Sequence, residues 1–307
     1  MKKFSLKLVL LILPFVILFS SMEYYVQTES TFSIKKKFLE NNLSSIEVLV
    51  FGSSHNQNAI NPEFLDKKTS NMAFGSQSIS IDYFLLDKYL DQLPKLKIVL
   101  FEISIRSFYN DFDKSNWNGY IYSNLYNIDY KVDKSSLKKY SLVYSNLGFF
   151  STIFFDYCNP YKYKYEINKY GFITNDFHDR FEKLNYDSIQ INRTYEIFHE
   201  FTNKDNLKLN KVFVEKFIKR CVDRNIKLIF ITPPLYKTYY SQIPNDAKIT
   251  VDNFVKSLSV KYNINYYNYT YDKRFNIRDF KNDNHLNSNG AFKFCQIINK
   301  NILDKNE

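Results

Sequence analysis

Val48-Leu-Val-Phe-Gly-Ser-Ser-His55 is a short apolar run that stops at a glycine and continues as polar residues. With Ile46, the apolar residues predict a buried β-strand over 46–51. Gly52 ends this strand, so the two serines and His55 are expected at its carboxyl end. Ligands and reacting groups gather at the carboxyl ends of the strands in an open parallel α/β sheet. This stretch therefore predicts a fold class and a candidate site together.

The rest of the chain alternates between strand-like and helix-like patterns. An apolar content of 45% is enough for a large core. We predict a three-layer α/β/α, flavodoxin-like sandwich with a five-stranded, mostly parallel sheet. Its further strands are expected at 71–74, 96–103, 226–232 and 264–267, and its helices at 79–90, 208–224, 252–262 and 290–302.

A long segment separates the third strand from the fourth. Residues 109–203 exceed what one crossover helix needs and are dense in Tyr, Phe and Asn. We predict an insertion that forms a lid over the strand ends. Its aromatic residues suit either core packing or stacking on sugar faces, and the sequence leaves both open.

The N-terminus has the pattern of an export signal. Lys2, Lys3 and Lys7 precede or flank the apolar run 8–19, and no small-x-small cleavage site follows. Counted over 4–21, the apolar stretch approaches a membrane span. We favour an uncleaved signal anchor over 1–22, followed by a stalk or short helix over 23–44 and the domain over 45–307. The domain is then outside the cytoplasm, membrane-anchored, or secreted if the signal is cleaved.

The charge and the cysteine content limit the kinds of partner and metal site that we expect. The net charge is +10, but the Lys residues are dispersed, so nucleic acid is not an expected partner. A weak attraction to anionic lipid or an acidic glycan fits better. The three cysteines have no metal or redox spacing, and Cys221 and Cys295 lie on apolar helical faces where burial is expected.

A second polar stretch complements the first. Asp283-Asn-His-Leu-Asn-Ser-Asn-Gly290 places His285 on a loop before the last predicted helix. Alone, Ser54 suits a turn and His285 suits a surface loop. Together, a serine at a strand end and a later loop histidine supply the groups of Ser–His acyl chemistry.

At these residues the chain resembles the SGNH/GDSL hydrolase superfamily, in its membrane-anchored, envelope-polysaccharide branch. The Gly-Ser-Ser-His block implies Ser54 as the nucleophile. The block Asn71-Met-Ala-Phe-Gly75 implies that the N–H groups of Ser54 and Gly75 form the oxyanion hole. The late block implies His285 as the base. His55 belongs to the family's first block without being the base, and we place it with Glu102 on the substrate side.

Two departures from the family pattern leave more than one assignment for the site residues. The family's Asp stands three residues before the His, where this chain has Asn282, and Asp283 follows one place later. Asn282 can hold a histidine tautomer but cannot offset its charge. Either Asp283 orients His285 after a small loop shift, or a Ser–His dyad operates, or activity is lost. The third block is also absent, and Ser104 is the candidate for a third oxyanion donor.

The resemblance implies serine-dependent acyl-ester chemistry, as an O-acetyl esterase or O-acyltransferase on a cell-envelope or extracellular polysaccharide. It implies no metal and no organic cofactor, and its partners are an acylated glycan and, through the anchor, a membrane. The competing interpretation is a degenerate hydrolase fold that binds or scaffolds polysaccharide or its assembly machinery.

Overall fold

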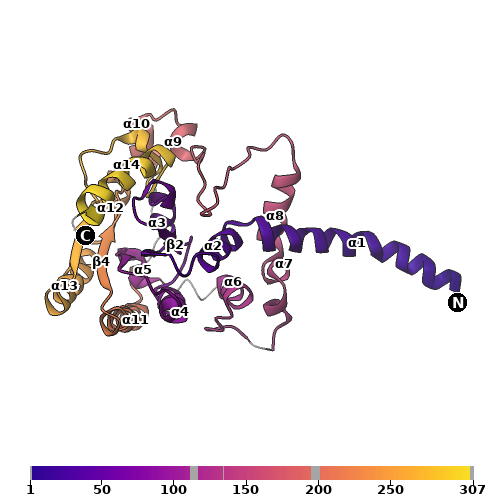
Figure 1. Cartoon of the computed structure of the whole chain (residues 1–307). Coiled ribbons are helices and arrows are strands. Elements are labelled where there is room, and N and C mark those ends of the chain that lie inside the picture. Colours follow the sequence, from indigo (N-terminus) through magenta and orange to yellow (C-terminus); the bar gives the residue numbers. More distant parts are fainter. Residues whose placement is uncertain (1, 111–116, 134, 195–200, 305–307) are drawn as a thin grey trace.

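A five-stranded parallel sheet forms the centre of the molecule (Figure 1). The computed structural model describes residues 2–110, 117–133, 135–194 and 201–304. The strands are β1 (Val48–Phe51), β2 (Thr69–Asn71), β3 (Ile98–Glu102), β4 (Lys227–Thr232) and β5 (Asn265–Asn268). Their order is β2-β1-β3-β4-β5, and all four pairings are parallel. This is the flavodoxin-like doubly wound order, so the predicted fold class is confirmed.

Alternation along the strands divides the core into two layers. In β1, Leu49 and Phe51 pack into one apolar cluster, whereas Val48 and Val50 pack into the other. Successive side chains of a strand point to opposite faces, so a nearly continuous apolar strand is buried on both sides. The sheet is thereby fixed in the middle of the domain, with its carboxyl ends free to carry functional groups.

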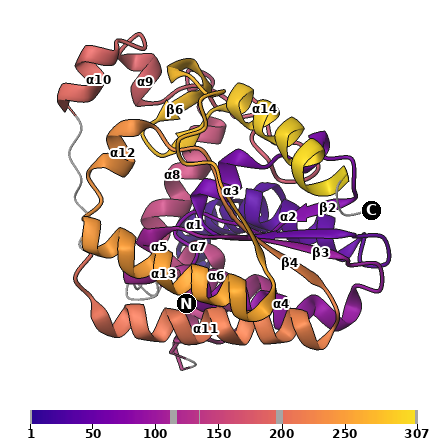
Figure 2. The ribbon, with the colours of Figure 1, turned by 90° about the vertical axis from the view of Figure 1, so that its left-hand side faces the viewer.

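Helices cover both faces of the sheet (Figure 2). The face carrying Leu49 packs against α4 (Ile79–Tyr89), α5 (Ile105–Tyr109), α11 (Lys204–Asp223) and α13 (Asn245–Tyr262). The other face packs against α3 (Ser54–Ala59) and α14 (Ser288–Ile298), which continues as the π-helical turn Asn299–Leu303. Short elements complete this frame: η1 (Pro62–Phe64), η2 (Leu90–Gln92), α12 (Lys237–Ser241), η5 (Ile277–Asp279) and the antiparallel hairpin β6 (Phe280–Asn282)–β7 (His285–Leu286).

The second strand lies earlier in the chain than predicted. It covers Thr69–Asn71 rather than 71–74. The next residues stay extended, since the Met72 and Phe74 N–H groups still donate to Val50 and Gly52 carbonyls (2.8 and 3.1 Å). The apolar run 72–74 is therefore the extended segment that leads from β2 to the site.

The N-terminal region begins as one long helix. α1 (Lys2–Glu29) is long and apolar enough to cross a membrane, and the large apolar side chains from Phe4 to Phe19 are exposed. Residues 23–44, predicted as a stalk or short helix, hold the end of α1 and α2 (Thr31–Glu40). Met22, Val26 and Leu39 are buried in the core, so this region packs as part of the domain.

The insertion 109–203 contacts two parts of the molecule that lie far apart. Its helices α6 (Trp117–Tyr126), α7 (Leu142–Ser145) and α8 (Leu147–Cys158), with η4 (Leu137–Tyr140), lie near the end of α1 (Figure 1). Its later helices, α9 (Arg180–Lys183) and α10 (Ser188–Thr194), lie toward the hairpin, and α9 packs on β6. This second part covers the hairpin that carries His285.

Candidate active site

The turn after β1 places Ser54 at the carboxyl edge of the sheet. Gly52 has φ +136°, and a Cβ added there would lie 2.3 Å from the Glu102 Cβ, so only glycine fits. Ser53 caps α3, and Ser54 is the first residue of that helix. A sharp strand-to-helix turn of this kind presents the serine hydroxyl above the sheet.

Glu102, at the end of β3, fixes this turn. One carboxylate oxygen accepts hydrogen bonds from the N–H groups of Ser53 (2.8 Å) and Asn56 (3.0 Å), and the other accepts from the Ser53 hydroxyl (2.6 Å). A carboxylate bound to N–H groups at a helix N-terminus makes strong, charge-assisted hydrogen bonds. Glu102 is only 4% exposed. It was predicted on the substrate side, but it is buried beneath the nucleophile and positions it.

The hairpin β6–β7 brings His285 to Ser54. His285 Nε2 lies 2.8 Å from Ser54 Oγ, although the two residues are 231 positions apart. Within the hairpin, Asn282 pairs with His285 across the two strands. The hairpin register therefore places the side chain of Asn282 beside the imidazole.

Asn282 holds His285 in one tautomer. Asn282 Oδ1 lies 3.0 Å from His285 Nδ1 and accepts the backbone N–H groups of His285 (3.0 Å) and Asn284 (3.2 Å). Asn282 Nδ2 donates to Asp179 Oδ2 at 2.5 Å. With donors on one side and a carboxylate on the other, the amide has one satisfactory orientation. The imidazole then carries its proton on Nδ1, so Nε2 accepts the Ser54 hydroxyl.

The surroundings keep this imidazole neutral. Burial, together with the nearby basic groups of His55, Lys281 and Arg106, holds the pKa of His285 well below 6.5. A neutral imidazole that accepts a serine hydroxyl is the resting state required of a general base.

Asp283 does not orient His285. Its carboxylate is 3% exposed and binds the Arg180 guanidinium and the Thr238 hydroxyl. The physical reason is the hairpin, because residue 282 pairs with residue 285 while residue 283 lies in the turn. The expectation that Asp283 replaces the usual triad carboxylate is therefore corrected: Asn282 takes that position.

Gly75 lies beside the nucleophile. A Cβ built on Gly75 would lie 4.0 Å from Ser54 Cβ and 3.5 Å from Gln57 Oε1. In the part of the chain that the structure describes, neither the Ser54 N–H nor the Gly75 N–H donates to a protein acceptor. Two free N–H groups next to a serine hydroxyl are suited to bind an oxyanion.

The loop that carries Gly75 packs against the N-terminal region. Lys35 of α2 is buried and donates from Nζ to the Ala73 carbonyl at 2.6 Å. Phe32 stacks on Phe74 with ring centroids 3.4 Å apart. Burial lowers the pKa of Lys35 to about 7. The helix that follows the apolar N-terminal helix thus supports the loop beside Ser54.

His55 and Ser104 lie on a neighbouring cleft. His55 is 5% exposed, with Nδ1 3.5 Å from Glu102 Oε1 and Nε2 3.3 Å from Asn284 Nδ2. Its ring centroid lies 5.6 Å from that of His285. Both His55 and Ser104 line a cleft with Thr232, Tyr239 and Asn268. Ser104 thus lines the cleft next to the Ser54–His285 pair, and its role as a third oxyanion donor stays a prediction.

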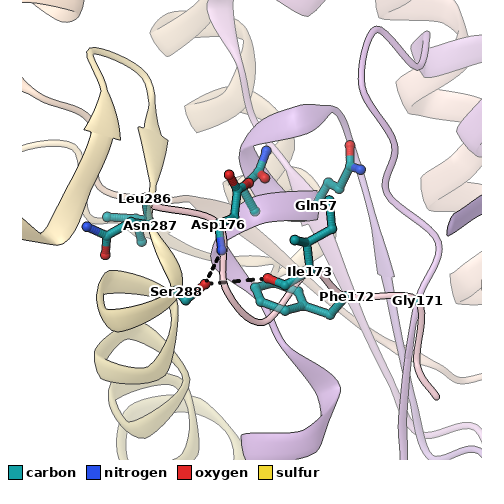
Figure 3. Close-up of a pocket in the computed structure, with 9 residues that line it drawn as sticks. Gln57, Gly171, Phe172, Ile173, Asp176, Leu286, Asn287 and Ser288 are labelled. Atoms are coloured by element: carbon teal, nitrogen blue, oxygen red, sulfur yellow. Dashed lines mark hydrogen bonds between the residues drawn. The ribbon is translucent and has the colours of Figure 1, made fainter. Parts of the chain in front are cut away.

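A small polar pocket lies on the other side of α3 (Figure 3). Gln57 and Asn58 of α3 meet the insertion loop 171–176 and residues 286–288 there. The Ser288 hydroxyl accepts the Asp176 N–H (3.0 Å) and donates to the Ile173 carbonyl (3.4 Å). The sequence did not single out Gln57, which reaches from this pocket toward Gly75.

Asp179 is the main residue that the sequence analysis missed. It belongs to the insertion, caps α9 and reaches Asn282 across 103 positions. No motif or periodicity marks it, and its neighbour His178 pairs with Glu182 at the surface. His199, another histidine of the insertion, lies outside the described residues. No group of three or more His, Cys, Asp or Glu among the described residues is arranged to hold a metal ion.

Comparison with known proteins gives similarity only to solved structures. No protein-family model matches the sequence, and no curated protein matches it. A candidate acylhydrolase from Bacteroides fragilis matches with a TM-score of 0.44 and 10% identity, over 89% of this chain and 97% of that one. A GDSL-like lipase from Bacteroides thetaiotaomicron matches with a TM-score of 0.43 and 8% identity, over 89% and 98%.

Proposed function

We propose that this protein is a serine esterase or O-acyltransferase of the SGNH/GDSL type. The observation that carries the proposal is the 2.8 Å contact between Ser54 Oγ and the Nε2 of a neutral His285. The Glu102 contacts with the turn and the Asn282 contact with Nδ1 favour it further, because each fixes one partner of the pair.

In the proposed reaction, Ser54 Oγ attacks the carbonyl carbon of an acyl ester while His285 Nε2 takes the hydroxyl proton. The carbonyl oxygen becomes an oxyanion beside the N–H groups of Ser54 and Gly75. Collapse of this intermediate breaks the ester bond, and the leaving alcohol takes the proton from His285. An acyl group remains on Ser54.

The second half of the reaction determines the enzyme class. Water or an acceptor hydroxyl gives its proton to His285 and attacks the acyl-enzyme, which restores Ser54. Water gives an esterase, and a sugar hydroxyl gives an O-acyltransferase. The imidazolium formed in each half is stabilised by Asn282 Oδ1, with the Asp179 carboxylate behind it.

An acylated polysaccharide outside the cytoplasm is the substrate class that we propose. The cleft beside His55 combines hydroxyl and amide groups with Tyr239, Tyr240 and Tyr266, a mixture suited to sugar hydroxyls and sugar faces. The apolar stretch of α1, which follows lysines at the start of that helix, favours a membrane-anchored protein whose domain is exported.

Turnover of p-nitrophenyl acetate by the purified full chain tests this proposal. We expect hydrolysis by the wild type and loss to the background rate in both Ser54→Ala and His285→Ala. An added oligosaccharide that reduces acetate release and gains the acetyl group identifies transfer. Absence of turnover in a folded wild type would contradict the proposal and favour the binding or scaffolding function.

A further inference from the structure

The exposed face of α8 is too apolar for a helix surrounded by water. Of its residues Leu147–Cys158, only Phe150 is buried. Leu147, Phe155 and Tyr157 are 54%, 51% and 56% exposed. Several large exposed apolar side chains on one short helix suit a contact with a partner or a membrane.

This helix lies against α1 where α1 enters the domain. Tyr25 of α1 packs on Phe154 and Tyr157, with ring centroids 5.8 and 4.4 Å apart. Glu23 accepts hydrogen bonds from the Ser141 hydroxyl (2.6 Å) and from the N–H groups of Leu142 and Val143 (2.9 and 3.0 Å). Figure 1 shows α7 and α8 lying across the base of α1. We name residues 137–165 the collar.

The length of α1 places the collar at a membrane surface. The apolar side chains from Phe4 to Phe19 are exposed, whereas Met22 and Val26 are buried in the domain. At about 1.5 Å per residue, the exposed part is about 24 Å long. A hydrocarbon core about 30 Å thick is about 6 Å longer, or about four residues, and so reaches to about Glu23, which binds the collar. The collar therefore begins where the hydrocarbon ends.

The polar residues of the collar also suit this depth. Tyr140 and Tyr161 are 72% and 95% exposed, and Tyr24 of α1 is 71% exposed. Lys139 Nζ lies 4.8 Å from the Tyr140 ring centre, and Lys164 Nζ lies 5.5 Å from that of Tyr157. Tyrosines and lysines beside apolar side chains are typical of the boundary between headgroups and acyl chains. Asp156 offers a negative charge on α8, and it pairs with Lys162 (3.6 Å).

We propose that the collar lies in the headgroup–acyl boundary of the membrane that α1 spans, and that it holds the catalytic domain at a fixed height and orientation. This inference rests on the proposed membrane location of α1 and not on the proposed ester chemistry. The occupant of the apolar face is the lipid bilayer itself.

Cys158, at the end of α8, allows a direct test. It is the one exposed cysteine, since Cys221 and Cys295 are buried. The full chain, labelled on Cys158 with an environment-sensitive fluorophore, is inserted into phosphatidylcholine–phosphatidylglycerol nanodiscs with nitroxide lipids labelled at the headgroup or deep in the chain. The matched control is Cys158→Ser with Val260→Cys, because Val260 is 86% exposed on α13 of the domain.

We expect headgroup nitroxides to remove about half of the Cys158 emission or more, as suits a helix about 5–10 Å deep in the boundary, and to leave the Val260→Cys label unquenched. The paired change Leu147→Glu and Phe155→Glu is expected to reduce this quenching, whereas Val260→Glu leaves it unchanged. Circular dichroism confirms that each variant is folded. Equal quenching at both labels, or a buried Cys158 label that no nitroxide lipid quenches, would overturn the inference. Ester turnover is measured on the same samples, so the two proposals fail separately.

Discussion

Asp179 is predicted to act on His285 through Asn282, and Asp179→Asn tests this most sharply. The substitution removes a negative charge but keeps an oxygen that accepts the Asn282 amide. The hydrogen bonds measure 3.0 Å (His285 Nδ1 to Asn282 Oδ1) and 2.5 Å (Asn282 Nδ2 to Asp179 Oδ2). The amide adds about 2 Å, so the charges lie about 7 Å apart in the transition state. At an effective dielectric constant of about 20, their attraction is about 2 kcal/mol.

This energy corresponds to a rate loss of about 30-fold. Asp179 is partly exposed, and screening by solvent reduces the expected loss to between about 5- and 30-fold. The pKa of His285 also falls further, because the charge that favours its protonated form is gone. The acid limb of the pH–rate profile therefore moves to lower pH while the plateau rate drops.

The assay is the second-order rate of Ser54 labelling by a fluorophosphonate, measured across pH. Asp187→Asn is the matched control, because Asp187 Oδ1 also accepts an N–H at the start of a short insertion helix (Ile189, 2.8 Å). A general loosening of the site would instead expose His285 and raise its pKa toward 6.5. The reasoning is refuted if Asp179→Asn labels at the wild-type rate with an unmoved acid limb, or if Asp187→Asn loses as much.

Other predictions follow from the same contacts. The wild-type labelling rate should stay on its plateau as the pH falls through 6.5, and decline only at the lowered pKa of His285; a limb centred at 6.5 would argue against a half-buried, neutral base. Glu102→Gln should lower the free energy of unfolding by about 2–4 kcal/mol in denaturant titrations and slow labelling, because the bonds to Ser53 and Asn56 lose their charge. Asp283→Asn should cost about 3 kcal/mol of stability through its ion pair with Arg180, yet leave the acid limb in place. Lys35 binds its proton less tightly when folded (pKa about 7, against 10.5), so wild-type stability should rise between these pH values, and Lys35→Met should lack this rise in thermal melts across pH.

The sheet and the Ser54–His285 pair follow from local sequence patterns. The strands β1, β3 and β4 are short, mainly apolar runs, and parallel strands collect their carboxyl ends at one edge. The position of Asp283 did not follow, because it depends on a hairpin register that the polar loop 282–285 does not reveal. Asp179 did not follow either, since its contact with Asn282 crosses 103 positions from an insertion without periodicity. The packing of 23–44 depends on Met22, Val26 and Leu39, whose helical spacing gives no sign of which part of the chain they contact.

The role of Asn282 shows why a single motif position is a weak guide to activity. At a site where a carboxylate is expected, the chain has an amide, which suggests a dyad or a lost activity. In the structure, the Asp179 carboxylate binds the far side of the Asn282 amide. The amide therefore lies between this carboxylate and the imidazole of His285. The orientation and the negative charge thus come from two residues instead of one.

The central claim is that His285 activates Ser54 as a nucleophile. Peptide mapping by mass spectrometry after fluorophosphonate treatment of the folded full chain tests it most directly. We predict one adduct, on Ser54, that is absent from Ser54→Ala and His285→Ala and present in Val260→Ala. A folded wild type without an adduct, or an adduct that persists in His285→Ala at the wild-type rate, would contradict the claim.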